Sequence, residues 1–152
     1  MKTFEIHSSD ANLGSFDGET AAHAIVAYHR AAGLASVVGA DGEVQHDPRD
    51  IESGAVVPSE TAALCAVEVP YAGAEITVHV GRDTIDPQGL SSDEECDACE
   101  EHILDAVREA FPGATVRAVS RGGRTSGTTR DGVNLDAEVR AVVTQAFDTF
   151  NW

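Results

Sequence analysis

Residues 92–111 read SDEECDACEEHILDAVREAF, and this stretch predicts the clearest helix in the chain. Its start fits a capping box, because Ser92 is a favourable N-cap residue and Glu95 stands three positions later. Pro112 and Gly113 mark its end, since proline cannot continue a helix and glycine readily terminates one. Apolar side chains recur within it at steps of three and four residues and therefore share one face: Cys96, Cys99, Ile103, Val107 and Ala110.

The rest of this helix surface is predicted to be strongly acidic. Residues 93–109 contain eight carboxylates and a single base, Arg108. The simpler interpretation is a face exposed to solvent, because runs of charge are usually solvated. The functional interpretation is a docking surface for a basic partner. Its candidate partner-binding residues are Asp93, Glu94, Asp97, Glu100, Glu101, Asp105 and Glu109.

The overall composition predicts one compact domain that binds no nucleic acid directly. The chain has 152 residues, of which 42% are hydrophobic, so it can bury a core. We expect a single α+β domain over residues 1–152, with a subdivision near residues 39–60 as the alternative. The net charge of −16 argues against binding to nucleic acid or an anionic membrane, and no apolar run is long enough to span a bilayer. It permits a basic protein or nucleoprotein complex as partner, cation binding, or adaptation to high salt.

Outside the central helix, the residue pattern predicts short strands and two further helices. Residues 70–73 (PYAG) supply turn chemistry, so residues 62–69 and 74–80 are predicted to form a β-hairpin. The expected fold is α+β, with a small mixed or antiparallel sheet of about four to five strands and three helices. Strands are predicted at residues 2–7, 34–38, 62–69, 74–80 and 114–120, helices at 19–32 and 135–150, and loops at 8–18, 39–53, 82–91 and 121–134.

The cysteines indicate a reducing compartment and a packing role. Their number is three, which is odd, and no signal peptide precedes them, so we expect a cytoplasmic protein. Cys96, Cys99 and His102 follow one another at three-residue steps, and a metal ion could in principle bridge them. Structural zinc sites normally place such a pair in a turn, however, and both cysteines lie on the apolar stripe. Core packing is therefore favoured, and we predict neither a metal nor another cofactor.

Residues 117–130 (RAVSRGGRTSGTTR) form the one basic segment, with four arginines and no acid. Backbone N–H groups of such a Gly- and Thr-rich loop could bind a phosphate or nucleotide, with Arg121, Arg124 and Arg130 as candidate anion-binding residues. The favoured alternative is that these arginines pair with the protein's own carboxylates. The chain contains no nucleophile elbow, P-loop, dinucleotide fingerprint or H-E-x-x-H motif, so an enzyme is less expected than a binding protein.

Residues 13–33 (LGSFDGETAAHAIVAYHRAAG) resemble a segment found in small accessory proteins of plasmids, integrative elements and phages. Residues 111–116 (FPGATV), together with a C-terminal helix that carries aromatics, look like proteins of the same kind. The resemblance implies a mobile-element context, in which small acidic proteins are often inhibitors of host defence, such as anti-CRISPR proteins and DNA mimics. It implies no catalytic residues.

Three functions therefore follow from the sequence. The first is an acidic interaction protein, an inhibitor of the anti-CRISPR or DNA-mimic type, that binds a basic nucleic-acid-processing partner. The second is a small-ligand, nucleotide-binding or enzymatic domain that uses the arginine loop. The third is a salt-adapted domain whose acidity keeps it hydrated. A homodimer is a further alternative, because three apolar side chains near the C-terminus could form its interface: Phe147, Phe150 and Trp152.

Overall fold

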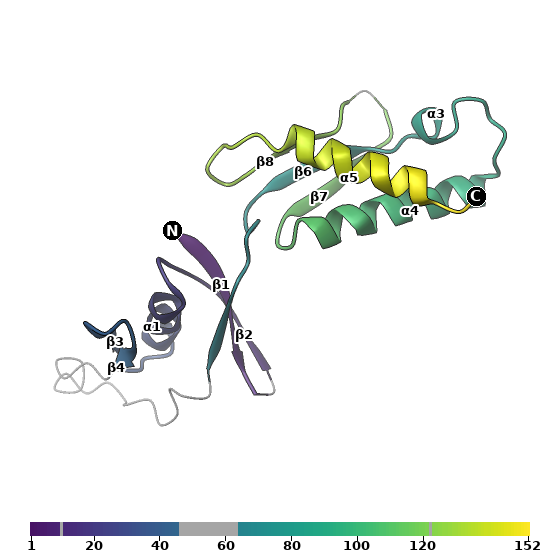
Figure 1. The fold of residues 1–152 in the computed structure, drawn as a ribbon. Coiled ribbons are helices and arrows are strands. Elements are labelled where there is room, and N and C mark those ends of the chain that lie inside the picture. The colour runs from purple at the N-terminus through teal and green to yellow at the C-terminus, as the bar shows by residue number, and fades with distance from the viewer. Residues whose placement is uncertain (10, 46–63, 122) are drawn as a thin grey trace. The chain divides into compact units, whose positions relative to one another are not determined.

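The computed structural model describes residues 1–9, 11–45, 64–121 and 123–152 of an α+β protein (Figure 1). The chain forms two compact units, Met1–Pro70 and Tyr71–Trp152, each with its own hydrophobic core. We call them the N-terminal and C-terminal units. The division falls at Pro70, whereas the sequence led us to expect one domain. The alternative boundary near residues 39–60 lies mostly outside the described residues.

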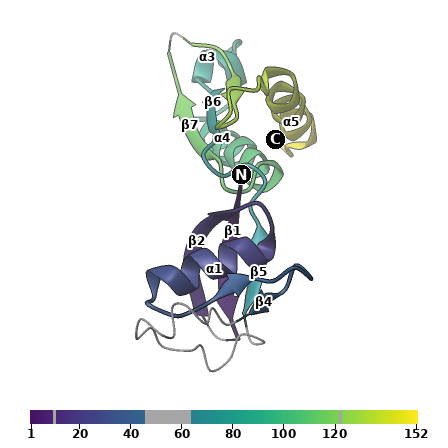
Figure 2. The same ribbon diagram turned by 90° about the vertical axis from the view of Figure 1, so that its left-hand side faces the viewer.

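The N-terminal unit is a three-stranded antiparallel sheet with a helix on one face. Its strands are β1 (Lys2–Ser8), β2 (Ala11–Gly18) and β5 (Cys65–Glu68), in the order β2-β1-β5. Helix α1 (Ala21–Ala31) lies against this sheet, as Figure 2 shows. A small second sheet pairs β3 (Val37–Val38) with β4 (Val44–Gln45). The core joins alternate residues of β1 to the helix: Phe4, Ile6, Ala24 and Ile25.

Residues 8–18, predicted to be a turn-rich connection, contain strand β2, so that prediction is wrong. Strand β2 pairs with β1 in an antiparallel register that places Phe16 opposite Phe4. The Phe16 ring meets Tyr28 of α1 edge-on, with 5.5 Å between the ring centroids. Asn12 and Ser15 are exposed on this edge strand, where polar side chains cost little.

The C-terminal unit is built on a parallel strand pair joined by helices. Strand β6 (Glu75–His79) is followed by α3 (Arg82–Ile85) and α4 (Asp93–Ala110), and the chain returns as β7 (Thr115–Val119), parallel to β6. Strand β8 (Ser126–Thr128) pairs with the other edge of β6, antiparallel, and α5 (Asp136–Thr149) ends the unit. The strand order is β7-β6-β8. Side chains of β6, α4 and α5 form the core, among them Ile76, Val78, Cys99, Ile103 and Val139.

The predicted hairpin of residues 62–69 and 74–80 is wrong. Strand β5 pairs with β1 in the N-terminal unit, and β6 pairs with β7 and β8 in the C-terminal unit. Residues 62 and 63 lie outside the described residues. A turn does form between the two strands, since Ala74 N donates to Tyr71 O at 3.0 Å. Tyr71 then packs edge-on against Phe111, which ties this turn to the end of α4 and not to a hairpin partner.

The three predicted helices are confirmed as α1, α4 and α5, and α3 is an addition within predicted loop 82–91. The capping box of α4 forms on both sides, because Ser92 Oγ accepts from Glu95 N at 3.2 Å and Glu95 Oε2 accepts from Ser92 N at 2.8 Å. The predicted apolar stripe is buried except for Ala110, which is exposed, and Leu104 joins it. The helix thus buries one face and leaves the carboxylates on the other.

Candidate functional site: the acidic face of α4 and its pocket

The outward face of α4 carries the predicted partner-binding carboxylates. All of them are exposed except Glu100, which is half-buried. Arg108, the single base of the helix, contacts Asp105 at 2.8 Å and Glu101 at 3.2 Å. These hydrogen bonds raise the pKa of the Arg108 guanidinium, so it stays charged. Four of the carboxylates have no ion pair within the described part of the chain: Glu94, Asp97, Glu100 and Glu109.

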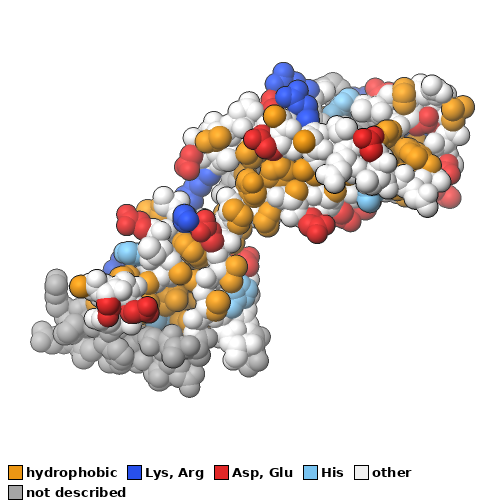
Figure 3. Space-filling model, viewed as in Figure 1, with side chains coloured by type: hydrophobic (Ala, Val, Ile, Leu, Met, Phe, Trp, Pro, Cys, Tyr) orange, Lys and Arg blue, Asp and Glu red, His pale blue; other side chains and the backbone are white. Residues whose placement is uncertain are grey.

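Negative charge in the C-terminal unit is concentrated on this helix. Residues 71–152 contain fifteen carboxylates and seven arginines, a net charge of −8. Helix α4 holds eight of the carboxylates and one of the arginines, so it carries −7 of that charge. In Figure 3 a cluster of Lys and Arg side chains lies at the top of the unit, away from α4, whereas Asp and Glu side chains lie over α4 and also over other parts of the visible face. The charge of the unit is therefore unevenly distributed. Adaptation to high salt would require only a uniformly acidic surface.

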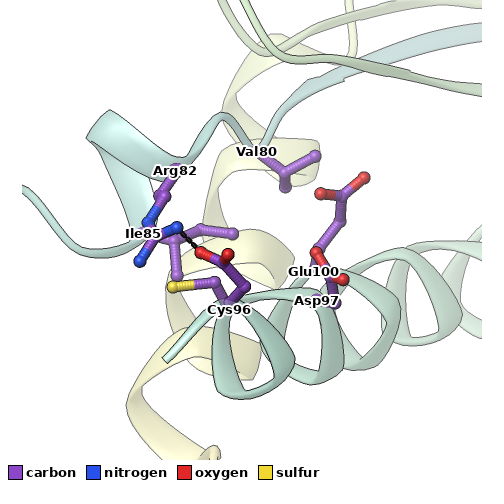
Figure 4. Close-up of a pocket in the computed structure, with 7 residues that line it drawn as sticks. Val80, Arg82, Ile85, Cys96, Asp97 and Glu100 are labelled. Atoms are coloured by element: carbon purple, nitrogen blue, oxygen red, sulfur yellow. Dashed lines mark ion pairs between the residues drawn. The ribbon is translucent and has the colours of Figure 1, made fainter. Parts of the chain in front are cut away.

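A pocket of about 380 Å³ opens beside the first half of α4. It lies where β6 ends and α3 begins, and α4 forms its third wall. In Figure 4, Arg82 stands on one side of the pocket, and Asp97 and Glu100 stand on the other. The lining combines apolar and charged side chains: Val80, Arg82, Ile85, Asp93, Cys96, Asp97 and Glu100.

The segment between β6 and α4 holds the pocket together. Arg82 forms an ion pair with Asp93 in the first turn of α4 and also donates from Nη2 to Ser91 O at 3.1 Å. Asp86 Oδ2 accepts from Ser91 N at 2.8 Å. This backbone hydrogen bond is the main reason that the pKa of Asp86 lies below its usual range. Asp86 therefore stays ionised and fixes the connection that brings Arg82 to the helix.

The apolar wall of the pocket belongs to the core of the unit. Val80 is 2% exposed, Ile85 4% and Cys96 5%, so these side chains are held firmly. Three carboxylates surround this wall, and one of them, Asp93, is occupied by Arg82. The arrangement can bind a cation that brings an apolar stem with it.

The cysteine–histidine triplet does not converge on a point. Cys96 and Cys99 are buried toward the core, and burial raises the pKa of the Cys99 thiol. His102 is exposed and packs against Phe150, with 5.6 Å between the ring centroids. No group of three His, Cys, Asp or Glu side chains among residues 1–9, 11–45, 64–121 and 123–152 is arranged to hold a metal ion.

The arginine loop is spread along β8. Arg124 Nη2 donates to Asp136 Oδ2 at 2.7 Å, as the self-pairing interpretation predicts. Arg130 lies beyond the other end of β8, where its side chain passes within 3.2 Å of the position a Cβ would take on Gly73. Arg121 is exposed just after β7. The three candidate anion-binding arginines thus do not face one common point.

Three residues of the pocket were absent from the sequence-based set: Val80, Arg82 and Ile85. They come from the end of β6 and from α3, which the sequence pattern assigned to a strand end and a loop. These residues lie beside α4 only because of the way the chain folds after β6. No local sequence pattern therefore indicates them.

No protein family, curated protein or solved structure matches this chain. None of the helices that the structure describes combines the length and apolar character needed to cross a bilayer.

Proposed function

We propose that this protein is an acidic interaction module that binds a basic, nucleic-acid-processing protein or nucleoprotein complex through α4. The carboxylates of the helix occupy the partner's Lys- and Arg-lined groove in place of nucleic-acid phosphates. The protein then acts as an inhibitor of the DNA-mimic type. In the mobile-element context implied by residues 13–33, the partner is a host-defence complex, as for an anti-CRISPR protein.

The observation that carries this proposal is the spacing of charge along α4. At a rise of 1.5 Å per residue, Asp93 and Glu109 lie about 24 Å apart along the helix axis. Eight carboxylates fall within that length, so on average one follows another every ~3.4 Å. One strand of duplex DNA carries its phosphates at about the same interval of 3.4 Å. Arg108 and Arg82 each offset one charge, Glu95 is engaged in the capping box, and Glu94, Asp97, Glu100 and Glu109 have no ion pair in the described part of the chain.

Salt adaptation is the second candidate function, and the net charge of the N-terminal unit supports it. Residues 1–70 contain eleven carboxylates and three bases, so they also carry −8. No described helix or strand of that unit concentrates carboxylates as α4 does. General acidification supports hydration in concentrated salt, and it predicts that the protein loses structure at low ionic strength. The interaction module is instead expected to stay folded there.

An affinity pulldown from the native host tests the proposed function, with washes at low and then high salt. We define an α4-neutral variant, which changes exposed helix carboxylates outside the pocket: Glu94→Gln, Asp105→Asn and Glu109→Gln. An off-helix control makes the same charge change at exposed positions elsewhere: Glu19→Gln, Glu138→Gln and Asp148→Asn.

The proposal predicts that the wild type and the off-helix control recover the same basic nucleic-acid-processing complex. High salt releases the complex, because surface charge pairs are screened. The α4-neutral variant is expected to recover little of it. Equal recovery by both variants would show that the position of the carboxylates on α4 does not matter, and would overturn the proposal.

A further inference from the structure

We propose that the pocket beside α4 receives one arginine side chain of the basic partner. This inference rests on the proposed function and adds a specific anchoring point to it. The acidic face alone would attract any basic surface. A pocket that takes a single guanidinium group with its aliphatic stem would fix where the partner docks.

The size and the wall of the pocket suit one long side chain. Its volume of about 380 Å³ lies near the lower limit of small-molecule sites, which span roughly 300–1,000 Å³. Val80, Ile85 and Cys96 supply an apolar wall that is almost fully buried. Arginine buries its methylene stem against such a surface and keeps its charged head near polar groups.

The charged side of the pocket has room for an incoming cation. Arg82 already neutralises Asp93, whereas Asp97 and Glu100 have no ion pair within the chain as described. These two carboxylates stand together on the side of the pocket opposite Arg82 (Figure 4). The complementary ligand is therefore a cation that approaches between Arg82 and the second turn of α4.

A guanidinium group fits this pair of carboxylates better than an ammonium group does. Its planar fork offers several N–H donors to two acceptors at once, and it loses less hydration on entering a partly apolar site. A bare metal ion is a poorer fit, because no three potential ligands converge in the described residues. The pocket thus predicts a preference for arginine over lysine.

The test is an NMR titration of the full chain with Nα-acetyl-arginine amide, observed at the methyl groups of Val80 and Ile85. Saturable shifts of these methyls are expected, with dissociation constants in the millimolar range for so small a ligand. Nα-acetyl-lysine amide should bind more weakly. Nα-acetyl-citrulline amide, which has the same shape and no charge, should not shift them.

Variants separate the pocket from the general acidity of the unit. Asp97→Asn combined with Glu100→Gln should weaken arginine-amide binding by roughly fivefold or more, because the double variant removes two charge pairs, each of which contributes modestly in water. Glu138→Gln, an exposed carboxylate of α5 outside the pocket, should leave arginine-amide binding unchanged. Amide spectra of each variant establish that it is folded.

The two proposals fail in different ways. The arginine pocket would be overturned by shifts that do not saturate, or by equal shifts with citrulline amide and in the double variant. Neither result would contradict a salt-sensitive pulldown through α4. Specific arginine-amide binding without any basic partner would instead contradict the proposed function and leave the pocket in place.

Discussion

Arg124 Nη2 lies 2.7 Å from Asp136 Oδ2, and the other oxygen of the same carboxylate accepts from Gly127 N at 3.0 Å. One side chain at the start of α5 therefore holds both the arginine loop and strand β8. Arg124 remains 78% exposed at its side chain, but its charge is already paired. This relationship explains why the most basic segment of the chain is a weak candidate for an external anion.

The first prediction concerns Asp136. The Gly127 N–H and then the Arg124 guanidinium hold the pKa of this carboxyl below its usual range. A depressed folded-state pKa stabilises the protein above the unfolded-state value of about 3.9, and this stabilisation is lost as pH falls through the folded-state value. Asp136→Asn should therefore lower the urea midpoint of the C-terminal unit at pH 7. The difference from wild type should shrink below about pH 4, and a constant difference at every pH would contradict this account.

The second prediction concerns the close approach of β8 to α5. A Cβ on Gly127 would lie 2.9 Å from Val139 Cγ2 and 3.1 Å from Leu135 Cβ. Gly127→Ala should therefore reduce the free energy of unfolding by about 1–3 kcal/mol, the usual cost of overpacking. Gly123→Ala is the matched control, because its Cβ would meet only Val119 Cγ1 at an ordinary 3.5 Å. Equal effects in urea unfolding would show that β8 is not packed this tightly.

The third prediction concerns the buried histidine of the N-terminal unit. His29 is 1% exposed, its Nδ1 lies 3.0 Å from Ser36 Oγ, and burial lowers the pKa of its imidazole. The unfolded chain then binds the proton more readily, so stability is full above about pH 6.5 and declines as pH falls below it. Thermal unfolding of the N-terminal unit should follow this dependence. His29→Gln should flatten it, and an unchanged slope in that variant would assign the dependence to other groups.

The fourth prediction concerns the thiols. Cys65 is exposed on β5, whereas Cys96 and Cys99 are buried on the inner face of α4. A thiol reagent such as DTNB should therefore modify one cysteine rapidly in the folded protein and all three after denaturation. Cys65→Ser should abolish the fast phase. Rapid modification of two or three thiols in the folded protein would mean that the core beneath α4 opens readily.

The parts of the fold that local sequence determines were predictable. Helix α4 has its capping box, apolar stripe and terminating Pro-Gly within one continuous segment, so each part of the prediction could be made from neighbouring residues. The same holds for α1, whose N-cap Thr20 accepts from His23 N at 3.4 Å.

Pairings between distant segments were not predictable in the same way. The turn at residues 70–73 favoured a hairpin, but Phe4 of β1 pairs with Glu68 of β5, far away in sequence. Which strands pair depends on which side chains become buried in the folded unit. A local turn pattern carries no information about that burial. The pocket has the same origin, because Val80 and Arg82 reach α4 only through the fold. Its carboxylates and Cys96 were identified from sequence, whereas Val80, Arg82 and Ile85 were not.

The salt dependence of partner binding tests the central claim most directly. The dissociation constant of the captured complex would be measured from low to high salt for the wild type, the α4-neutral variant and the off-helix control. We predict that the α4-neutral variant binds roughly tenfold more weakly at low salt and with a shallower salt dependence, because several charge pairs are lost at the interface. The off-helix control should match the wild type. Equal weakening of both variants, or an affinity that salt does not change, would contradict the role of α4.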